Sequence, residues 1–460
     1  MNGEWVDEFL LSGPDHEAVL TLGAVVTRGE LRAEVQRRQQ ELRSAGLTPG
    51  GVAVLRLPPS LTLVATLLAG WRGAAQCALV DHRLTSSEAD AAIERINPQV
   101  VVTPDREIRG RLRGYFETDS VITARESGES AHTEHVLLQL SSGSTGPSKV
   151  IGRTAESLMA EVERYGMLSA YPKNGERIVV LASVIHVLGL VGGLLYGLHN
   201  RIPLTLPSSH TADSVHGAVA ADPAPTTLLG VPSQAALLAT VQSPPRLPQL
   251  TGMITGGETV KAKTWEFFTS RYGVPLGGMY GMTEAGMIAT DLLGTTRPGL
   301  TPAPGMTVEI ADGEILLRLP ASPYVGRADP TRYVDGRLRT KDAGTLDPAT
   351  GLLTVHGRLD QQVSVGGLKV DLTEVEELLS RLPGVREAVV VQGSGIEAYV
   401  AVTDTMVTGE ELSRAAAVRL AAYKRPRRLT VLPAIPRTPT GKPLRSADAL
   451  RAAARAQVAR

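Results

Sequence analysis

Hydrophobic and polar positions alternate along the first 135 residues in a pattern that predicts helices between buried strands. Short apolar runs have the length of strands buried on both faces, and longer segments between them carry apolar residues at helical spacing. Thr27 and Glu30 form a capping box before the first helix. This alternation favours a mostly parallel sheet with helices on its faces. The predicted strands are 52–57, 77–80 and 99–103, and the predicted helices are 31–46, 61–75 and 87–96.

The same alternation continues to about residue 298 and then changes. Beyond this point short strands lie between Gly and Pro turns, which predicts an antiparallel sheet or a small barrel. Before it, strands are predicted at 177–183, 202–206, 226–231, 251–255 and 274–280, and helices near 155–165, 187–198, 233–241 and 261–271.

A second change of composition, at 358–370, predicts a domain boundary. We expect an α/β protein whose large N-terminal domain, residues 1–359, combines helix-flanked mixed sheets with a small β-barrel-like subdomain. Residues 360–460 are expected to form a small α+β domain, with a hinge at Asp360. The elements predicted there are a helix capped by Thr373 and Glu376, strands 387–392 and 397–402, a helix from Thr408 to Tyr423, and a strand at 429–435.

Composition indicates a soluble globular protein of more than one domain. A chain of 460 residues is too long for one ordinary core, and 43% of its residues are hydrophobic and 20% charged. The net charge is zero, but residues 415–460 hold eleven Lys or Arg and a single acid, Asp448. Few aromatic residues lie among these charges, which makes nucleic-acid binding a weak interpretation.

Three features bear on the cellular compartment. The single cysteine, Cys77, excludes an intramolecular disulfide framework, and its apolar surroundings predict core packing rather than nucleophilic catalysis. The N-terminus lacks a signal-peptide pattern. The longest apolar stretch, 183–198, is shorter than the roughly 20 residues of a membrane span. We therefore expect a cytoplasmic protein without a membrane span.

A loop of small and hydroxyl residues follows the apolar strand 136–140. Its N–H groups and hydroxyls can surround a phosphate, because glycines let the backbone approach the anion. Lys149 adds a charge for phosphate oxygens, and no Gly precedes it at the Walker A position. A flexible linker is the alternative, although linkers are not usually held between two buried runs. The loop residues are Ser141, Ser142, Gly143, Ser144, Thr145 and Gly146.

Further motifs follow this loop in a fixed order. They are GMYGMTEAG at 278–286, TKDAG at 340–344, GRLD at 357–360 and TPTGKP at 438–443. Together with the loop they resemble the adenylate-forming superfamily, which includes acyl-CoA synthetases, adenylation domains and luciferases. The resemblance covers nearly the whole chain, and it implies that ATP and Mg²⁺ activate a carboxylic acid.

The resemblance implies a role for each residue of the nucleotide motifs. Tyr280 would stack on adenine, Thr283 would contact the adenylate phosphate as a catalytic residue, and Glu284 would hold Mg²⁺. Asp342 and Arg358 would bind the ribose hydroxyls. The other residues expected around the nucleotide are Gly256, Gly257, Glu258, Gly281 and Met282.

The chain departs from the family pattern at two of these motifs. The family's phosphate loop reads T-G-x-P-K-G, whereas residues 145–150 read TGPSKV, with the proline displaced and the last glycine absent. The family's T-G-D motif is also altered, because Lys341 stands in place of its glycine.

Lys442 occupies the family's P-T-G-K position, which implies catalysis. Carboxylate attack on the α-phosphorus concentrates negative charge, and an ammonium group there stabilises the transition state. The resemblance further implies that the small domain rotates about Asp360 between two half-reactions. In the second state, Gly366 and Gly367 would leave room for the thiol arm of coenzyme A or of a carrier protein's phosphopantetheine.

A cluster of cations in the C-terminal region has two interpretations. It is either a solvated face or a landing site for the acceptor, meaning the phosphates of coenzyme A or a separate acidic carrier protein. The cluster consists of Lys424, Arg425, Arg427 and Arg428.

The acid pocket is predicted from the segments that bound it in the family. Amino-acid-activating members carry an Asp at the start of the first segment, where this chain reads HVLGL at 186–190, so an α-amino acid is disfavoured. The apolar lining suits an aryl or short-to-medium acyl carboxylate. The pocket residues are His186, which is also expected to be catalytic, Val187, Leu190, Val231, Gly257, Gly281 and Met282.

These expectations combine into an AMP-forming acid–thiol ligase. The acid would attack ATP to give acyl-AMP and pyrophosphate, and a thiol of coenzyme A or a carrier protein would then displace AMP. An amide synthetase that passes the acyl group to an amine is the nearest alternative. A non-catalytic nucleotide-binding scaffold is a remote one, and the fold alone also permits luciferase-type oxygenation.

Overall fold

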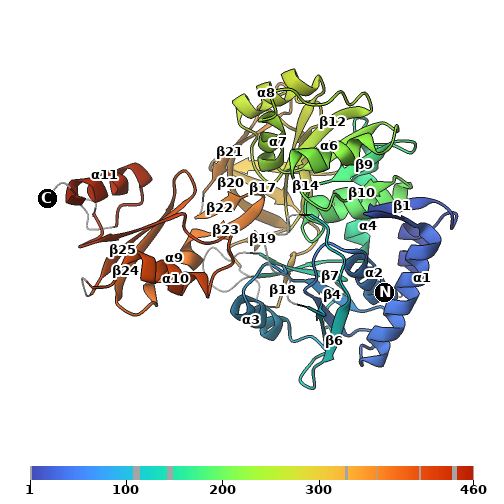
Figure 1. The fold of residues 1–460 in the computed structure, drawn as a ribbon, viewed down its shortest axis with the longest axis horizontal. Coiled ribbons are helices and arrows are strands. Elements are labelled where there is room, and N and C mark those ends of the chain that lie inside the picture. Colours follow the sequence, from blue (N-terminus) through green and yellow to red (C-terminus); the bar gives the residue numbers. More distant parts are fainter. Residues whose placement is uncertain are drawn as a thin grey trace. The chain divides into compact units, whose positions relative to one another are not determined.

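The computed structural model describes residues 3–106, 114–141, 149–326, 330–359, 361–403, 406–437 and 443–458. These form two compact units (Figure 1). Unit 1 comprises Met1–His82, Ile93–Leu140 and Val150–Gly357, and unit 2 comprises Arg83–Ala92, Ser141–Lys149 and Arg358–Arg460. The expected phosphate-loop residues 142–148, the expected hinge Asp360 and the expected catalytic Lys442 lie outside the described residues.

The largest sheet of unit 1 is parallel in its middle and antiparallel at its edges. Its nine strands run in the order β15-β14-β13-β12-β11-β9-β10-β1-β2, and all pairs from β13 to β1 are parallel. Its strands are β1 (Ala18–Leu22), β2 (Ala24–Thr27), β9 (Arg177–Val180), β10 (Leu204–Thr205), β11 (Thr226–Gly230), β12 (Leu250–Gly256), β13 (Leu276–Met282), β14 (Gly286–Asp291) and β15 (Thr301–Pro302).

A second sheet of unit 1 has seven strands in the order β18-β8-β7-β4-β3-β5-β6. The pairs joining β7, β4, β3 and β5 are parallel, as the alternating pattern predicts, and β6 and β18 add antiparallel edges. Its strands are β3 (Val52–Leu55), β4 (Gln76–Leu79), β5 (Val100–Pro104), β6 (Ser120–Ala124), β7 (Leu137–Ser141), β8 (Lys149–Arg153) and β18 (Tyr324–Val325).

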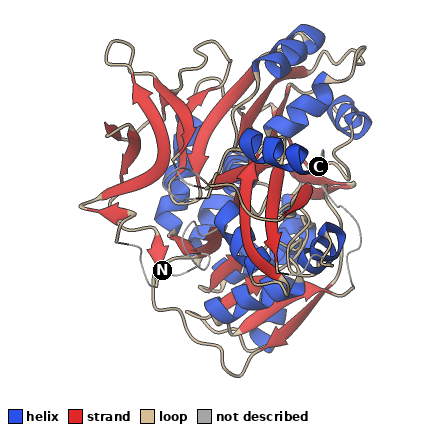
Figure 2. Ribbon diagram, turned by 90° about the vertical axis from the view of Figure 1, so that its left-hand side faces the viewer, coloured by secondary structure: helices blue, strands red, loops and turns tan. Residues whose placement is uncertain are grey.

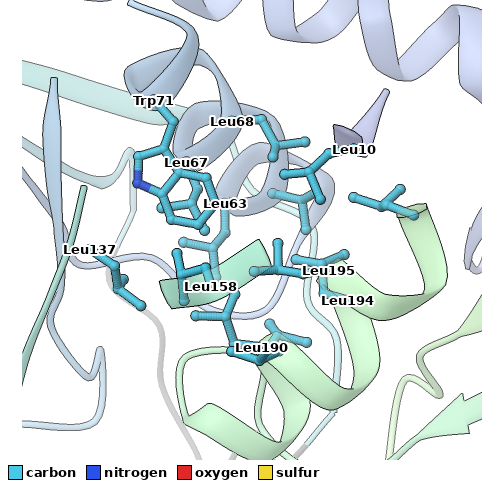
Figure 3. Packing of buried hydrophobic residues seen from close by; sticks show 14 of the residues in the cluster. Leu10, Leu63, Leu67, Leu68, Trp71, Leu137, Leu158, Leu190, Leu194 and Leu195 are labelled. Carbon is cyan, nitrogen blue, oxygen red and sulfur yellow. The ribbon is translucent and has the colours of Figure 1, made fainter. Parts of the chain in front are cut away.

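Apolar side chains of several helices pack with those of these two sheets in one core (Figure 3). Helix α2 is buried along almost its whole length, because its residues are apolar on every side. Trp71 shows how closely the helix meets the second sheet, since its indole N–H donates to the carbonyl of Val136 at 2.8 Å. The elements that contribute are η1 (Val6–Leu10), α1 (Arg28–Ser44), α2 (Leu61–Arg72), α4 (Ala155–Met167), η2 (Leu188–Leu195) and α5 (Tyr196–Asn200).

Three more helices cover the other face of the nine-stranded sheet. Figure 1 shows them together beside β12, and Figure 2 shows helices flanking the strands. Their apolar residues form a second core with β9, β11, β12 and β13. They are α6 (Ala212–Ala220), α7 (Pro232–Ala239) and α8 (Ala262–Tyr272). None of the described helices combines the length and apolar content needed to cross a membrane.

The region after residue 298 forms the predicted antiparallel sheet. Four strands run in the order β16-β17-β20-β19, and β21 pairs with β20. Its apolar residues pack with those of β8 and β14, so this sheet closes over one edge of unit 1. The strands are β16 (Val308–Ala311), β17 (Glu314–Arg318), β19 (Tyr333–Val334), β20 (Arg337–Leu346) and β21 (Leu353–Arg358).

Unit 2 has a core of its own, built from two small sheets and their helices. A hairpin pairs β22 with β23, and a three-stranded sheet pairs β24 antiparallel and β26 parallel to β25. Helix α3 (Ser86–Ile96) begins in this unit. The other elements are β22 (Gln362–Val365), β23 (Leu368–Asp371), α9 (Leu372–Ser380), β24 (Val385–Gln392), β25 (Ile396–Val402), α10 (Gly409–Ala417), β26 (Arg428–Leu432) and α11 (Ala447–Val458).

Three predicted helix details are wrong. Asp371 caps α9 in place of Thr373, because its carboxylate accepts the Thr373 N–H at 2.7 Å. Helix α10 ends at Ala417 rather than near Tyr423, since the guanidinium of Arg425 donates to the Ala417 carbonyl at 2.7 Å. Residues 188–195 form a π-helix instead of an α-helix. The capping box of Thr27 and Glu30 is confirmed.

Candidate functional site

Three parallel strands end at one edge of the nine-stranded sheet. Gly230 of β11 pairs with Thr255 of β12, and Gly256 of β12 pairs with Met279 of β13. Ligands of open α/β sheets bind at such carboxyl ends. The structure therefore brings together three segments predicted to line one site, namely Val231, the Gly256–Glu258 turn and Tyr280–Met282.

Tyr280 and Asp342 are in direct contact at this edge. The Tyr280 hydroxyl donates to Oδ2 of Asp342 at 2.6 Å, and the aspartate is 7% exposed. Tyr280 lies on β13 and Asp342 on β20, so the bond joins two sheets. The adenine and ribose residues of the resemblance are thus neighbours, and their contact with a nucleotide remains a prediction.

Lys341 keeps the backbone shape that the missing glycine would have. Its φ is +61°, in the left-handed region that residues other than glycine rarely adopt. A register shift between β17 and β20 surrounds it, and Glu314 accepts its N–H at 2.9 Å. The same carboxylate accepts a hydrogen bond from Nε of Arg339 at 2.8 Å. This buried glutamate holds the bulge that presents Asp342.

Thr283 and Glu284 lie in the short loop between β13 and β14. Oε1 of Glu284 accepts the Tyr324 hydroxyl at 3.2 Å, and Nη2 of Arg332 lies 3.7 Å from it. A carboxylate suits Mg²⁺, which is commonly held by one or two carboxylates together with substrate phosphates. No cluster of three or more metal-ligating side chains exists in the described part of the chain, and the contact of Glu284 with Mg²⁺ stays a prediction.

A buried glutamate of helix α4 stabilises the loop that holds Thr283 and Glu284. Glu161 of α4 is fully buried, accepts Nη2 of Arg153 at 2.8 Å and accepts the Met287 N–H at 3.0 Å. Gly286 has a φ of +74°, and a Cβ there would meet Glu161 at 2.1 Å. The sequence interpretation missed this pair, although a charged residue at the spacing of Leu158 and Val162 was a signal for it.

His186, predicted as a catalytic and acid-pocket residue, lies near a buried carboxylate. Its Nε2 is 3.9 Å from Oδ2 of Asp81, and its side chain is 46% exposed. His82 Nδ1 approaches the other oxygen of Asp81 at 3.7 Å. His186 is therefore accessible and faces an acid that sequence reasoning did not single out.

The π-helix places the residues after His186 differently from their prediction. Leu190 is fully buried and packs in the core with Leu158 and Leu194 (Figure 3), so its assignment as an accessible lining residue is wrong. Val187 is only partly buried against this core. A Cβ at Gly256 would meet Leu188 at 3.2 Å, which places the π-helix against the glycine turn. π-Helical turns are frequent at functional sites.

The predicted acceptor residues of unit 2 divide into two groups. Gly366 and Gly367 both have positive φ and form the turn between β22 and β23. Arg427 and Arg428 are exposed, as a landing site requires. Lys424 is buried, which argues against its part in a landing site, and Arg425 is partly buried.

Lys424 is a buried cation between two carboxylates. It is 7% exposed, and its Nζ lies 2.9 Å from Oε1 of Glu88 and 2.8 Å from Oε1 of Glu374. Burial acts to lower the pKa of this ammonium, but Glu374 and Glu88 outweigh it and hold the pKa above its usual value. The guanidinium of Arg425 donates to the carbonyls of Leu420 and Ala417. Both residues have structural roles.

Cys77 is confirmed as a core residue. Its side chain is fully buried on β4, and burial raises the pKa of its thiol to about 12. A thiol in this state is a poor nucleophile, because the thiolate is the reactive form.

Comparison with protein families identifies two matching regions. The chain matches the model described as AMP-binding enzyme over residues 7–323 and the model described as AMP-binding enzyme C-terminal domain over residues 374–442.

Two curated relatives share this similarity over most of the chain. A p-hydroxybenzoic acid–AMP ligase of Mycobacterium tuberculosis is 28% identical, with 92% of this chain and 65% of that protein covered. A 2-succinylbenzoate–CoA ligase of Listeria monocytogenes is 26% identical, with 95% of this chain and 97% of that protein covered. The chain thus spans about two thirds of the length of the first relative.

Two solved structures have a similar fold. An o-succinylbenzoate CoA synthetase from Bacillus subtilis aligns with a TM-score of 0.82 at 22% identity, covering 97% of this chain and 98% of that one. An amide bond synthetase from Marinactinospora thermotolerans aligns with a TM-score of 0.77 at 25% identity, covering 96% and 98%. The α/β fold predicted from the sequence is confirmed.

Proposed function

The chain belongs to the AMP-binding enzyme family, and from this premise we propose that it is an AMP-forming acid–thiol ligase. A carboxylic acid attacks the α-phosphorus of ATP, which gives acyl-AMP and pyrophosphate. The thiol of coenzyme A or of a carrier protein's phosphopantetheine then displaces AMP. The observation that carries the proposal is the Tyr280–Asp342 hydrogen bond, which unites the adenine and ribose motifs in one site beside the loop of Thr283 and Glu284.

The residues of this site divide the chemistry between them. Tyr280 and Asp342 orient the adenosine end of the nucleotide, and Thr283 holds the phosphate of the adenylate. Glu284 would hold Mg²⁺, and the metal would supply positive charge that offsets the charge of the phosphates. Lys442 stabilises the charge that develops at the α-phosphorus, and the small domain carries it in and out by rotation about Asp360.

The acid is proposed to be an aryl or a short-to-medium acyl carboxylate. The segment that begins at His186 offers no carboxylate for an α-ammonium group, since it reads HVLGL at 186–190. Both curated relatives are named for acids with an aromatic ring, which supports an aryl acid.

An amide synthetase is the second candidate. The structural similarity to an amide bond synthetase favours it, and the accessible His186 beside Asp81 could take a proton from an amine. The first half-reaction is the same, so the two candidates differ only in the acceptor.

A panel of carboxylic acids with ATP and Mg²⁺ tests the proposal through pyrophosphate release. Release is expected with aryl acids and is expected to be weak with α-amino acids. Mass spectrometry of products formed with coenzyme A and with simple amines then identifies the acceptor. If no acid on the panel releases pyrophosphate, the chain acts as a nucleotide-binding scaffold and the proposal fails.

A further inference from the structure

Arg332 is a buried cation whose surroundings satisfy it only in part. Its side chain is 6% exposed, and its Nε is buried without a hydrogen-bond partner in the described chain. Its contact with a charged group is the 3.7 Å approach of Nη2 to Glu284, which is too long for a hydrogen bond. Buried charges are normally both paired and hydrogen-bonded, whereas among the described residues this guanidinium has no carboxylate within hydrogen-bond distance.

Other buried arginines of unit 1 show the contrast. Arg153 donates to Glu161 at 2.8 Å, and Arg38 donates to Glu34 at 2.9 Å. Both therefore have the direct, charge-assisted bonds that Arg332 does not form with Glu284. Burying a purely structural ion pair costs the hydration free energy of both groups, and attraction across 3.7 Å without a hydrogen bond offsets little of that cost.

The position of Arg332 indicates which anion it would meet. Glu284 is the proposed Mg²⁺ ligand, and Tyr324, which also bonds Glu284, lies on β18. β18 pairs with β8, the strand that follows the expected phosphate loop in the sequence. Tyr280 and Asp342, by contrast, serve the adenosine end. Arg332 therefore lies at the metal and phosphate side of the site.

We propose that Arg332 binds the β- and γ-phosphates of ATP, the part that leaves as pyrophosphate. The guanidinium suits phosphate oxygens because its planar N–H groups can donate in pairs. The proposal rests on the proposed function, since it uses the same nucleotide site. It adds a phosphate ligand that comes from the antiparallel sheet rather than from the phosphate loop.

Equilibrium binding to the full chain tests the proposal, with Mg-ATP, pyrophosphate and AMP as ligands. Arg332→Met is expected to weaken the binding of ATP and of pyrophosphate about ten- to hundredfold, the range for hydrogen bonds to charged groups. The affinity for AMP is expected to change less than about twofold. Arg332→Lys should recover part of the loss because it keeps the charge. Arg337→Met is the matched control, since Arg337 pairs with Glu309 at 2.8 Å on the same sheet.

A second measurement separates direct contact from an effect through Glu284. ATP binding is repeated with EDTA in place of Mg²⁺. Direct contact predicts that Arg332→Met still weakens ATP without metal, whereas a residue that only orients Glu284 would show no loss there. Thermal unfolding identifies a variant that fails to fold, in which case Arg332→Lys, with weaker ATP and unchanged AMP, decides.

The inference is overturned if Arg332→Met leaves ATP unchanged, or if ATP and AMP weaken equally. Wild-type behaviour distinguishes this from failure of the proposed function. A wild-type chain that binds ATP and releases pyrophosphate with an acid, while the variant behaves identically, contradicts the inference alone. A wild-type chain that does neither contradicts the proposed function itself.

Discussion

The hydroxyl of Tyr280 donates a 2.6 Å hydrogen bond to Asp342, 62 residues later in the chain. The bond connects the nine-stranded sheet, where adenine is proposed to stack, to the antiparallel sheet, where the ribose is proposed to bind. Each residue therefore orients the other before a nucleotide arrives, which reduces the entropy lost on binding.

Tyr280→Phe tests this pre-organisation, because it keeps the ring and removes the hydrogen bond. We expect the KM for ATP to rise about three- to tenfold, in line with the loss of one hydrogen bond. Steady-state kinetics of pyrophosphate release measure the change. Tyr333→Phe is the control, since Tyr333 donates to the Leu319 carbonyl at 2.9 Å on the antiparallel sheet. Equal effects in both variants would contradict the role of Tyr280.

Glu161→Gln removes the charge that pairs with the buried Arg153. We expect the free energy of unfolding to fall by about 3 kcal/mol, because a buried guanidinium then lacks its counter-charge. Denaturant unfolding measures it, with Glu156→Gln, an exposed residue of the same helix, as the control. A stability close to that of the wild type would show that the Glu161–Arg153 ion pair next to the Glu284 loop is dispensable.

Lys442→Ala is expected to reduce acid-dependent ATP–pyrophosphate exchange by about two to three orders of magnitude, the effect of removing one transition-state donor. The expectation rests on the TPTGKP motif alone. Lys263→Ala, an exposed lysine on α8, should leave exchange unchanged. Exchange at the wild-type rate in the Lys442 variant would remove this residue from the chemistry.

Reversing the charges of Arg427 and Arg428 to Glu tests the acceptor site. We expect a higher KM for the acceptor with unchanged adenylation, since both side chains are exposed. Arg381→Glu is the control, because its side chain is also exposed, at 80%. Loss of adenylation instead would indicate that the pair is structural, as Lys424 and Arg425 are.

Stability is expected to fall in mild acid through His216. Burial lowers the pKa of this imidazole, whose Nε2 lies 2.7 Å from the Tyr272 hydroxyl. The unfolded chain therefore binds the proton first, so the contribution is complete above about pH 6.5 and is lost as the pH falls through the lowered pKa. The free energy of unfolding, measured at pH values between about 8 and 5, should depend less steeply on pH in His216→Gln than in the control His132→Gln. Equal slopes would contradict this assignment.

Local signals predicted the helices and strands better than they predicted the charged residues. The capping box of Thr27 and Glu30 and the apolar runs of the parallel sheets act within a few residues, so the sequence shows them directly. Lys424 differs, because its partner Glu88 lies on α3, more than three hundred residues earlier. Burial by such a distant partner leaves no trace in the surrounding sequence.

The candidate site shows the same division. The motifs predicted Tyr280, Glu284 and Asp342 as site residues, whereas two groups that lie next to them, Glu314 and Arg332, belong to no motif. Leu190 was misplaced because the change from an α-helix to a π-helix alters which side chains face the core. That change depends on packing around the glycines, which apolar periodicity does not report.

The burial of Cys77 has a practical consequence for identifying the acceptor. The chain contains one cysteine, and its thiol is enclosed by the core with a pKa raised to about 12. Thiol-reactive dyes will therefore not label the native enzyme at neutral pH. The loss of free thiol in a reaction mixture can then be assigned to coenzyme A or a carrier arm, and followed continuously without a correction for the protein.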